Sequence, residues 1–473
     1  MTDAIQRAGQ WDLLECNLLT STGLKHNLHP HIIGVTLYEN MFQSCMSGEL
    51  ILHNSFSLSN IAPIIGQEFL SIKFGTPTLT DDKASLDFTE NIFHVRGMAN
   101  REVLNETEVI KLDFVSIELM RNLRMRVSES LDGSVSSIVS SMLGRVECEK
   151  DRYIEPSNGN IRYIAPNISP FDVIRKLAPR AISGTTTQMS PCPVYAFWES
   201  TKGMHFRTID SCIAQKPRWD YKKIEMEKEL TKGQPPILKG LQAIRGLTLS
   251  TNDSMMDMAT GVLNSRLITH NTHTKSFSVT DYNYLDRFDY EQHIGGGHPL
   301  YSKSGHGISK HGKDRISDGV GKIIMTSTVE HQNDFFDPSF SDGAGNNSFV
   351  GYKPETWVQR RKSQINQIMD AITIRLDAMG NTVVSAGDMV NVDLPKKQTD
   401  KVEGEKDKFD AFVQGQFLVK AIKHTFVLGG DHTMNMELVR DSFAVEHEEI
   451  EVSIEPRPVN KGHEYNDIYV VEG

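Results

Sequence analysis

The most informative segment of the sequence lies near the end of the chain. It reads Phe417-Leu-Val-Lys-Ala-Ile-Lys-His-Thr-Phe-Val427, then Gly429-Gly-Asp431, then Thr433-Met-Asn-Met-Glu-Leu-Val-Arg-Asp-Ser442. Apolar and polar residues alternate along both arms, as they do in strands with one buried face. The glycine-rich segment between the arms predicts a tight turn. The stretch therefore predicts an antiparallel hairpin.

A second stretch, far upstream, repeats features of this hairpin. Phe93-His-Val95-Arg96 is similar to Phe417-Leu-Val419-Lys420. Thr107-Glu-Val-Ile-Lys-Leu112 with Ser116 is similar to Thr433-Met-Asn-Met-Glu-Leu438 with Ser442. Two explanations stay open: an internal duplication, or chance similarity between strand pairs that obey the same period-two rule. Duplication predicts two related β-domains, each closed by a similar hairpin.

Length and composition are those of an ordinary globular protein. The chain of 473 residues suffices for about three domains of ~150 residues. Apolar residues make up 38% and charged residues 23%, which is neither a fibrous nor a disordered composition. No apolar run approaches the ~18 residues of a membrane span, and Met1–Arg7 lacks the apolar core of a secretory signal. We therefore expect no membrane span and cytoplasm-like conditions.

Charge and cysteine content narrow the possible partners and cofactors. A net charge of −11 argues against a surface that grips nucleic acid, but it suits an acidic wall past which DNA slides. The cysteines have no Cys-x-x-Cys spacing, so neither a disulfide framework nor a zinc site is predicted. We interpret them as small, mostly buried thiols: Cys16, Cys45, Cys148, Cys192 and Cys212.

Two kinds of periodicity divide the first half of the chain. Residues 10–117 predict nearly continuous β-structure, which favours a barrel or sandwich. Beyond residue 116 apolar residues recur three and four apart, and Ser169, Pro170 and Asp172 mark a helix start, so a small α+β insert is predicted. The predicted strands are 11–19, 31–38, 48–58, 67–75, 85–98, 108–117, 193–199, 203–208 and 218–223, and the helices are 118–123, 134–143 and 170–178.

The second half predicts another insert and the second β-domain. Residues 291–351 are loop-like apart from one strand, as functional, partner-covered or disordered segments are. Arg360-Arg361-Lys362 is interpreted as a solvated helix face. The acidic tail ends in Asp467–Val471, which suits pairing with a partner's sheet edge. Helices are expected at 225–233, 240–244 and 354–369, the last starting at Pro354; strands at 265–270, 275–284, 322–329, 371–376 and 387–395; and a charged loop at 396–408.

Catalytic motifs are missing from the sequence. It has no Walker loop, no His-Glu-x-x-His, no Gly-x-Ser-x-Gly elbow and no dinucleotide fingerprint. Histidines do crowd into one region, and imidazole is the commonest metal ligand. Their spacings match no ligand rule, so we interpret them as loop residues and keep a metal site as the alternative. The crowded histidines are His270, His273, His293, His298, His306, His311 and His331. No catalytic, cofactor-binding or metal-ligating residue is assigned.

Four sets of motifs, spread in order over most of the chain, together carry a family resemblance. They are Glu39-Asn-Met-Phe42 with Ser47-Gly48; Ile164-Ala-Pro-Asn-Ile-Ser-Pro-Phe-Asp172 with Ala178-Pro-Arg-Ala181; Ala386-Gly-Asp-Met-Val-Asn-Val392; and Phe417-Leu-Val-Lys420 with Leu438-Val-Arg-Asp-Ser442. The combination resembles the central baseplate hub protein of contractile-tailed bacteriophages, which is related to the hub part of type VI secretion spikes.

The resemblance implies a structural protein and not an enzyme. It implies a homotrimer in which each subunit contributes two tube-like β-barrels, so that six barrels form a pseudo-sixfold ring. Such a hub joins the sixfold tail tube to the threefold central spike and leaves a channel through which DNA passes without specific binding. Implied partners are tail-tube or tube-initiator proteins, the central spike and the surrounding baseplate wedge. The location is the virion tail baseplate, assembled in the host cytoplasm, and no cofactor is implied.

The expected fold class is mainly β with α+β inserts. The domains are expected at 1–118 (first tube-like barrel), 119–205 (α+β insert), 206–245 with 355–445 (second barrel, discontinuous), 246–354 (insert with a Gly/Ser/His-rich loop) and 446–473 (acidic extension). Two alternatives are a tail-associated cell-wall hydrolase and a receptor- or carbohydrate-binding tail protein. The hydrolase needs a buried carboxylate or a bound metal, and the binding protein needs an exposed aromatic groove.

Overall fold

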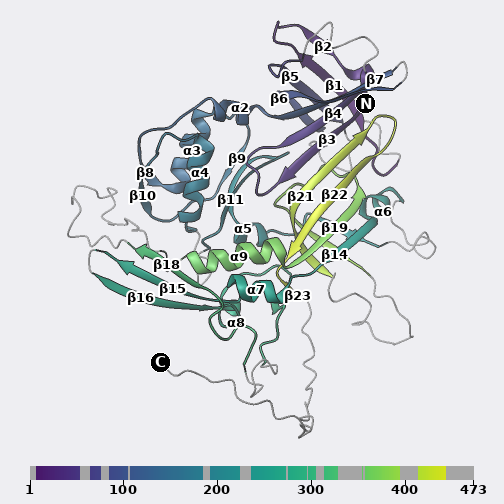
Figure 1. The fold of residues 1–473 in the computed structure, drawn as a ribbon. Helices are drawn as coiled ribbons and strands as arrows, with labels where there is room; N and C mark the ends of the chain where they lie inside the picture. The colour runs from purple at the N-terminus through teal and green to yellow at the C-terminus, as the bar shows by residue number, and fades with distance from the viewer. Residues whose placement is uncertain are drawn as a thin grey trace, which may run out of the picture.

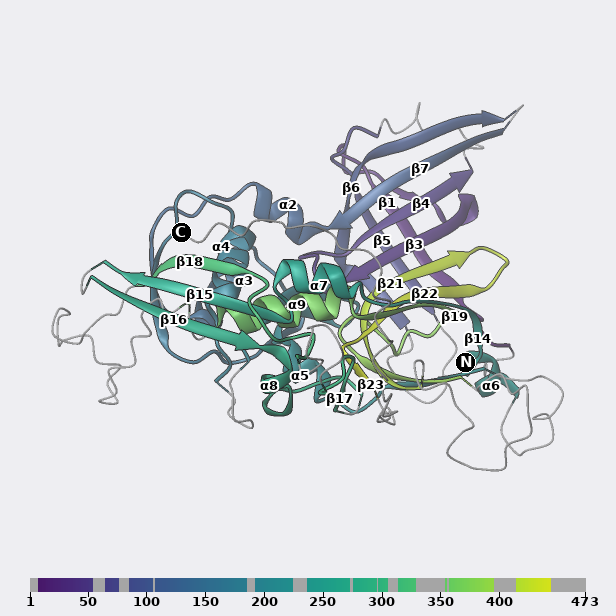
Figure 2. The same cartoon turned by 60° about the horizontal axis from the view of Figure 1, so that its bottom comes forward.

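The structure is a computed structural model that describes most of the chain. The described residues are 7–53, 64–75, 85–104, 107–184, 192–223, 236–272, 275–295, 297–304, 314–328, 354, 357–394 and 414–443. The helix expected at 225–233, the loop at 396–408, the extension 446–473 with Asp467–Val471, and four of the crowded histidines lie outside these residues. The fold class is as expected: a large, mainly antiparallel sheet with smaller α+β inserts (Figures 1 and 2).

The first β-unit is built from the strands that precede residue 117. They pair in the order β2-β1-β5-β6-β7-β4-β3, with every pair antiparallel. Buried and half-buried residues alternate along β4 and β5, as period two requires. The strands are β1 Asp12–Leu19, β2 Lys25–Asn27, β3 Ile32–Asn40, β4 Ser47–His53, β5 Phe69–Gly75, β6 Ser85–Leu104 and β7 Thr107–Ser116, and the 3-10 helix η1 covers His29–His31.

Side chains close the core of this unit across the curled sheet. The ring of Phe74 on β5 stacks on Phe426, which belongs to a strand at the other end of the ladder, with ring centres 4.3 Å apart. Trp11 meets the same Phe426 ring edge-on at 5.2 Å. The sheet therefore wraps one core although its first and last strands do not pair within the described residues.

An α+β insert follows β7 and has its own core. Ser169 caps α4 by accepting the backbone N–H of Asp172, as predicted. Helices α3 and α4 pack together at one side of the molecule (Figure 1). The elements are α2 Ile117–Leu123, β8 Ser130–Ser134, α3 Val135–Arg145, β9 Arg152–Ile154, β10 Asn160–Ile164, α4 Pro170–Leu177, η2 Ala178–Arg180, β11 Tyr195–Ser200, β12 Gly203–Thr208 and α5 Ile209–Ile213.

The second β-unit draws its strands from two parts of the chain. They pair in the order β14-β19-β22-β21-β20-β13, and an isolated bridge between Lys222 and Ala243 links the two ends. The helix expected at 240–244 ends at Gln242, and β14 follows it, a strand that the sequence analysis missed. The elements are β13 Trp219–Lys222, α6 Pro236–Gln242, β14 Ile244–Ser250, β19 Ile372–Met379, β20 Met389–Asp393, β21 Gly415–Val427, β22 His432–Arg440 and β23 Ser442–Phe443.

The second insert forms a small sheet, β16-β15-β18, beside helix α9 (Figure 1). The strands predicted at 265–270, 275–284 and 322–329 are confirmed. Helix α9 starts at Val358 and not at Pro354. Arg360 is only 7% exposed and pairs with Asp210 and Glu291, so the solvated-face interpretation was wrong for this residue. The elements are α7 Ser254–Thr260, β15 Asn264–Asn271, β16 Ser276–Asn283, α8 Tyr284–Arg287, η3 Phe288–Tyr290, β17 His298–Pro299, β18 Ile323–Thr328 and α9 Val358–Asp370.

The two β-units have the same strand order. Taken along the chain, β1, β3, β4, β5, β6 and β7 correspond to β13, β14, β19, β20, β21 and β22, and neighbours in one sheet are neighbours in the other. One pair differs, because β13 and β20 are parallel whereas β1 and β5 are antiparallel. This correspondence supports duplication over chance similarity.

Bulges align the two units residue by residue. Arg96 bulges from β6 and Lys420 from β21, which confirms the similarity of the first hairpin arms. On the second arm the registers match Phe114 with Leu438, so the similarity noted there was two residues out of step. Ile33 and Arg245 bulge in the same way, and the registers align Ile32-Ile-Gly-Val-Thr-Leu-Tyr38 with Ile244-Arg-Gly-Leu-Thr-Leu-Ser250.

Candidate functional site

The two β-units meet edge to edge where β3 pairs with β21. The ladder is antiparallel and runs from Ala421 opposite Asn40 to Val427 opposite Gly34. Gly34 allows the close approach, because a Cβ there would lie 2.9 Å from the carbonyl oxygen of Phe426. This ladder joins the strands of both units into one 13-stranded sheet.

Glu39, at the end of this ladder, is a buried carboxylate held by fixed donors. It accepts the backbone N–H groups of Ala386 at 3.0 Å and Thr201 at 3.3 Å, and His424 Nε2 lies 3.6 Å away. Burial raises the pKa of Glu39, but the contacts with His424, Ala386 and Thr201 outweigh burial and hold that pKa below its usual value. Two motifs far apart in sequence, at Glu39 and Ala386, thus meet at one buried charge.

His424 continues this polar chain into the second unit. Its Nδ1 lies 3.1 Å from Nε2 of His432, which is fully buried. Burial, with His424 adding to it, places the pKa of His432 well below its usual value, so this ring is neutral. Gly380 lies against the same ring and leaves no room for a Cβ. These contacts make the histidines structural parts of the junction.

The Ala386-Gly-Asp388 loop connects the junction to the first insert. Trp198 donates its indole N–H to the carbonyl of Ala386 at 3.0 Å, and its ring covers Gly387, whose φ is +93°. Lys202 donates to Asp388 at 2.5 Å, and the same carboxylate accepts the backbone N–H of Ser385 at 2.9 Å. The loop motif is therefore a docking point for strand β11 and the turn after it.

A second buried charge cluster joins the first insert to the first β-unit. Lys150 Nζ lies 2.6 Å from both Glu118 Oε2 and Glu199 Oε1. Glu199 also accepts the hydroxyl of Ser116 at 2.8 Å and the backbone N–H of Met46 at 2.9 Å. Burial raises the pKa of Glu199. Both oxygens of Glu199 have protein donors, which is the arrangement of a structural carboxylate.

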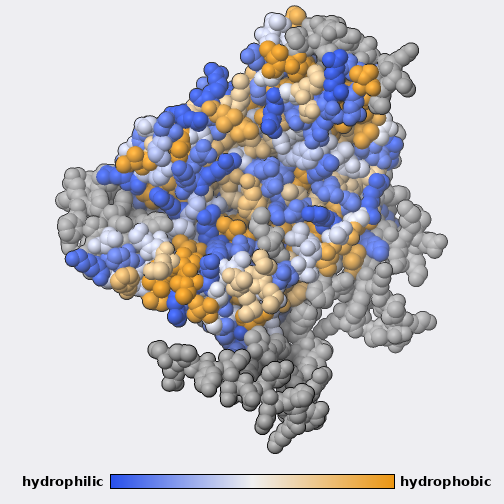
Figure 3. All heavy atoms as spheres, in the orientation of Figure 1, coloured by the Kyte–Doolittle hydropathy of each residue, from blue (hydrophilic) through white to orange (hydrophobic). Residues whose placement is uncertain are grey.

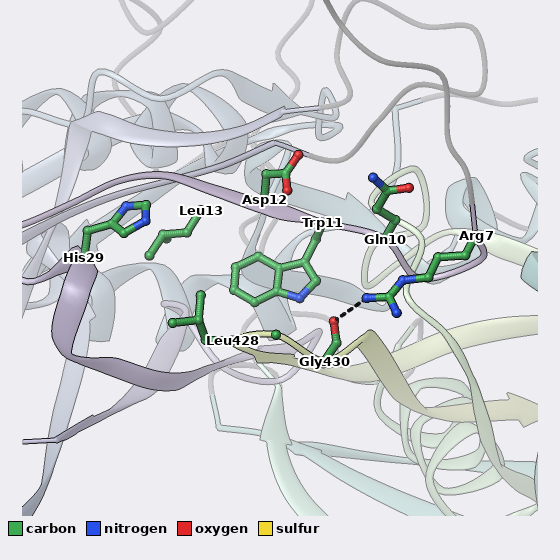
Figure 4. A pocket seen from close by; sticks show the side chains of 9 residues that line it. Arg7, Gln10, Trp11, Asp12, Leu13, His29, Leu428 and Gly430 are labelled. Atoms are coloured by element: carbon green, nitrogen blue, oxygen red, sulfur yellow. Dashed lines mark hydrogen bonds between the residues drawn. The ribbon is translucent and has the colours of Figure 1, made fainter.

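Two hollows lie near these contacts. One of about 220 Å³ lies beside the charge cluster and is lined by Lys150, Glu199, Asp87 and Asn91 among others. The other, of about 710 Å³, lies between the start of β1 and the β21–β22 turn, where Trp11 faces Leu428 and Arg7 donates to the carbonyl of Gly430 at 3.3 Å (Figure 4). Ser200 also lines the smaller hollow, and its hydroxyl lies 2.8 Å from Nε2 of His205. Burial, with Arg207 adding to it, lowers the pKa of His205 to about 3, so this imidazole is a weak base for activating a hydroxyl.

The described histidines of the crowded region are dispersed. His270 stacks on Phe277. His293 contacts the carboxylate of Asp441 at 2.8 Å and the carbonyl of Phe288 at 2.9 Å, and His298 lies in β17. Within the described part of the chain, no three or more His, Cys, Asp or Glu residues are grouped so that they could hold a metal. The assignment of no metal ligand stays a prediction, because the other four histidines lie outside that part.

No sequence pattern pointed to Lys150, Glu199 or His424, whereas the absence of Cys-x-x-Cys spacing correctly predicted free, buried cysteines. A signal for Glu199 exists: it is a charged residue inside Tyr195–Ser200, a strand that is buried throughout. All five cysteines are free and buried, as expected. In the described residues no helix is long and apolar enough to cross a membrane.

Comparison with known proteins finds similarity of structure alone. No family model matches the sequence, and no curated protein matches it. A tail protein from Neisseria meningitidis shares 8% identity at a TM-score of 0.48, covering 90% of this chain and 96% of the other. A 43 kDa prophage tail protein from Shewanella oneidensis shares 7% sequence identity at a TM-score of 0.49, and the match covers 90% of this chain and 98% of the other. An E. coli component of the type VI secretion system shares 8% sequence identity at a TM-score of 0.40, and the match covers 93% of this chain and 78% of the other.

Proposed function

We propose that this protein is the structural hub of a contractile phage tail baseplate. One observation carries the proposal: a single chain holds two β-units of the same strand order, joined edge to edge through β3 and β21. Three copies then supply six similar units, which fit a sixfold tube on one face and a threefold spike on the other. The baseplate-hub motifs lend support, because they supply the junction contacts at Glu39 and Ala386.

The proposal includes a non-enzymatic role and a passage for DNA. A hydrolase would need a buried carboxylate, and the buried carboxylates at the two charge clusters, Glu39, Glu118 and Glu199, are each engaged by cations or backbone donors. The net charge of −11 suits a channel wall that does not retain DNA. Tail-tube, spike and wedge proteins are the proposed partners, in the virion tail. The five domain ranges predicted above belong to this proposal, with the boundary predicted between 245 and 246 placed after β14, because that strand pairs with β19 of the second β-unit.

Light scattering over a range of concentrations, with and without chelator, tests the proposal. The expected mass is three times 53.2 kDa, unchanged by chelator. Electron microscopy should then show a ring with a central opening. Clearing of peptidoglycan by the purified protein, without any partner, would overturn the structural role. A mass that depends on chelator would instead revive the metal site among the crowded histidines.

A further inference from the structure

Strand β14 is the counterpart of β3, yet among the described residues its outer edge forms no ladder, and only the single bridge from the preceding Ala243 to Lys222 lies on that side. The aligned segments Ile32–Tyr38 and Ile244–Ser250 share isoleucine, glycine, threonine and leucine at matching positions and bulge at the same place. Strand β3 has β4 on one side and β21 on the other. Within the described residues β14 forms a ladder with β19 alone. Gly246 keeps the position of Gly34, but the atoms nearest to a Cβ there belong to Asp377 of the paired strand β19, whereas those at Gly34 belong to the neighbouring strand β21.

The complementary edge is on β6, where residues 97–104 pair with one strand only among the described residues. Residues 421–426 of β21 pair with both β22 and β3, and Val427 pairs with β3. Their counterparts in β6 are residues 97–104, with one extra bulge at Ala99. These pair with β7, whereas β5 pairs with β6 only as far as His94 in the described residues. One chain therefore contains one complete junction, the β3–β21 ladder, which we call the filled junction. It also contains the counterparts of both strands of that ladder, β14 and residues 97–104 of β6, which do not pair with each other and which we call the open halves.

Burial differs between the filled junction and the open halves. Val35, Leu37 and Phe426 are at most 1% exposed where β3 meets β21. Their counterparts at the open edges are Leu247, Leu249 and Val103. Leu249 is 38% exposed and Val103 is 69% exposed. Open strand edges with exposed apolar side chains favour pairing with another chain.

We propose that β14 of one copy pairs antiparallel with residues 97–104 of β6 in a second copy. The register follows from the internal junction: Val103 lies opposite Leu247, Glu102 opposite Thr248, and Arg101 opposite Leu249. The contact is head to tail, so each copy offers one open edge of each kind to its two neighbours. The proposal depends on the proposed function only for the closure of the ring at three copies.

Cysteine cross-linking between separately substituted chains tests this register. We would mix Glu102→Cys protein with Thr248→Cys protein and oxidise the mixture. Directly opposed residues of an antiparallel pair have Cα atoms about 5 Å apart, within reach of a disulfide. A covalent dimer is expected in the mixture and in neither protein alone. The background is low because the five native cysteines are buried.

Two matched controls define the outcome. The first control is one chain that carries both Thr36→Cys and Thr425→Cys, which occupy the equivalent positions of the internal junction. A disulfide must form within that chain. The second control mixes Glu102→Cys protein with Ser250→Cys protein. Ser250 lies on the same face of β14 as Thr248 but two residues away from the proposed register, so this pair should cross-link far less. If the internal control closes and the Glu102–Thr248 pair does not, the proposed pairing is wrong. If light scattering then still shows a trimer, the hub proposal survives with a different interface.

Charge substitutions separate this edge from another exposed apolar surface. Phe277, Val279, Ile323 and Met325 are exposed on β16 and β18, and part of this surface is visible at the lower left of Figure 3. We expect Leu249→Asp or Val103→Asp to abolish self-association, and Ile164→Asp, an exposed site on the first insert, to leave it intact. Loss of association in Val279→Asp but not in Leu249→Asp would overturn the proposal. Covalent chains longer than three in the doubly substituted Glu102→Cys/Thr248→Cys protein would support the pairing and contradict the threefold hub.

Discussion

The two β-units share a strand order and matching bulges, yet they fill their cores differently. At one cross-strand position the first unit pairs Gly48 with Phe114, and the second pairs Ile374 with Leu438. A small and a large residue in one unit thus replace two medium residues in the other. Register and alternation are therefore what the units retain, while individual side chains are free to change as long as the shared volume is filled.

The units also differ in how they hold their inserts. A buried acid follows each closing hairpin within two residues of the strand end: Glu118 after β7 and Asp441 after β22. Glu118 pairs with Lys150, a permanent cation, in the first insert. Asp441 pairs with His293, a titratable group, in the second insert. We therefore predict that the stability of the Glu118–Lys150 attachment changes little with pH near neutrality, whereas that of the Asp441–His293 attachment depends on pH.

The largest expected effect comes from Lys150→Met. This change leaves Glu118 and Glu199 buried without their shared cation, and breaking a buried ion pair in this way costs about 3–5 kcal/mol. Urea denaturation should show that loss in the free energy of unfolding. The control is Lys25→Met, which removes an exposed pair with Glu15 and should cost at most about 1 kcal/mol. Equal effects of the two changes would show that the charge cluster does not hold the first insert.

Exchanging the core pair between the units tests whether shared volume is the retained property. In Gly48→Ile the new side chain meets the Phe114 ring, and its Cβ lies 2.5 Å from the carbonyl oxygen of Thr36. We expect a loss of about 1–3 kcal/mol from overpacking. Adding Phe114→Leu reproduces the pair of the second unit and should recover part of that loss in urea denaturation. A double variant no more stable than Gly48→Ile alone would contradict the equivalence of the two sites.

Local patterns in the sequence predicted most strands of the two β-units and the closing hairpins, because apolar and polar residues alternate along these strands. They did not predict the short strands β8, β9 and β10 of the first insert. They also did not predict β14, although its Ile-x-Gly-x-Thr-Leu pattern repeats that of β3. The strand was not predicted because it directly follows helix α6 and contains few β-branched or aromatic residues, which are the residues that favour strands. The charge clusters were missed for another reason: Lys150, Glu118 and Glu199 lie far apart in sequence, and only the fold brings them together. The same holds for Glu39 and Ala386, which matched family motifs without any visible partner.

A smaller effect is expected from Asp441→Asn. The carboxylate contacts His293 Nδ1 and accepts the backbone N–H of Ile294, both at 2.8 Å. The amide keeps one acceptor but loses the charge, so we expect a cost of about 1–3 kcal/mol. Hydrogen exchange of the Ile294 amide should accelerate, while amides around Lys150 keep their protection. Uniform acceleration in both inserts would show that the two attachments are not independent.

The smallest expected effect is a pH dependence confined to the second attachment. Burial lowers the pKa of His293, but Asp441, with the carbonyl of Phe288 and Glu291, outweighs burial and raises that pKa above its usual value. A raised pKa in the folded state means that the pairing stabilises fully below the unfolded value of about 6.5 and fades as pH rises through the folded value. The difference in unfolding free energy between the native protein and His293→Gln should therefore shrink from pH 6 upward. The cost of Lys25→Met, measured over the same range, gives the baseline for general charge effects. A difference that grows with pH would contradict the charged state of His293 and with it the contrast between the two attachments.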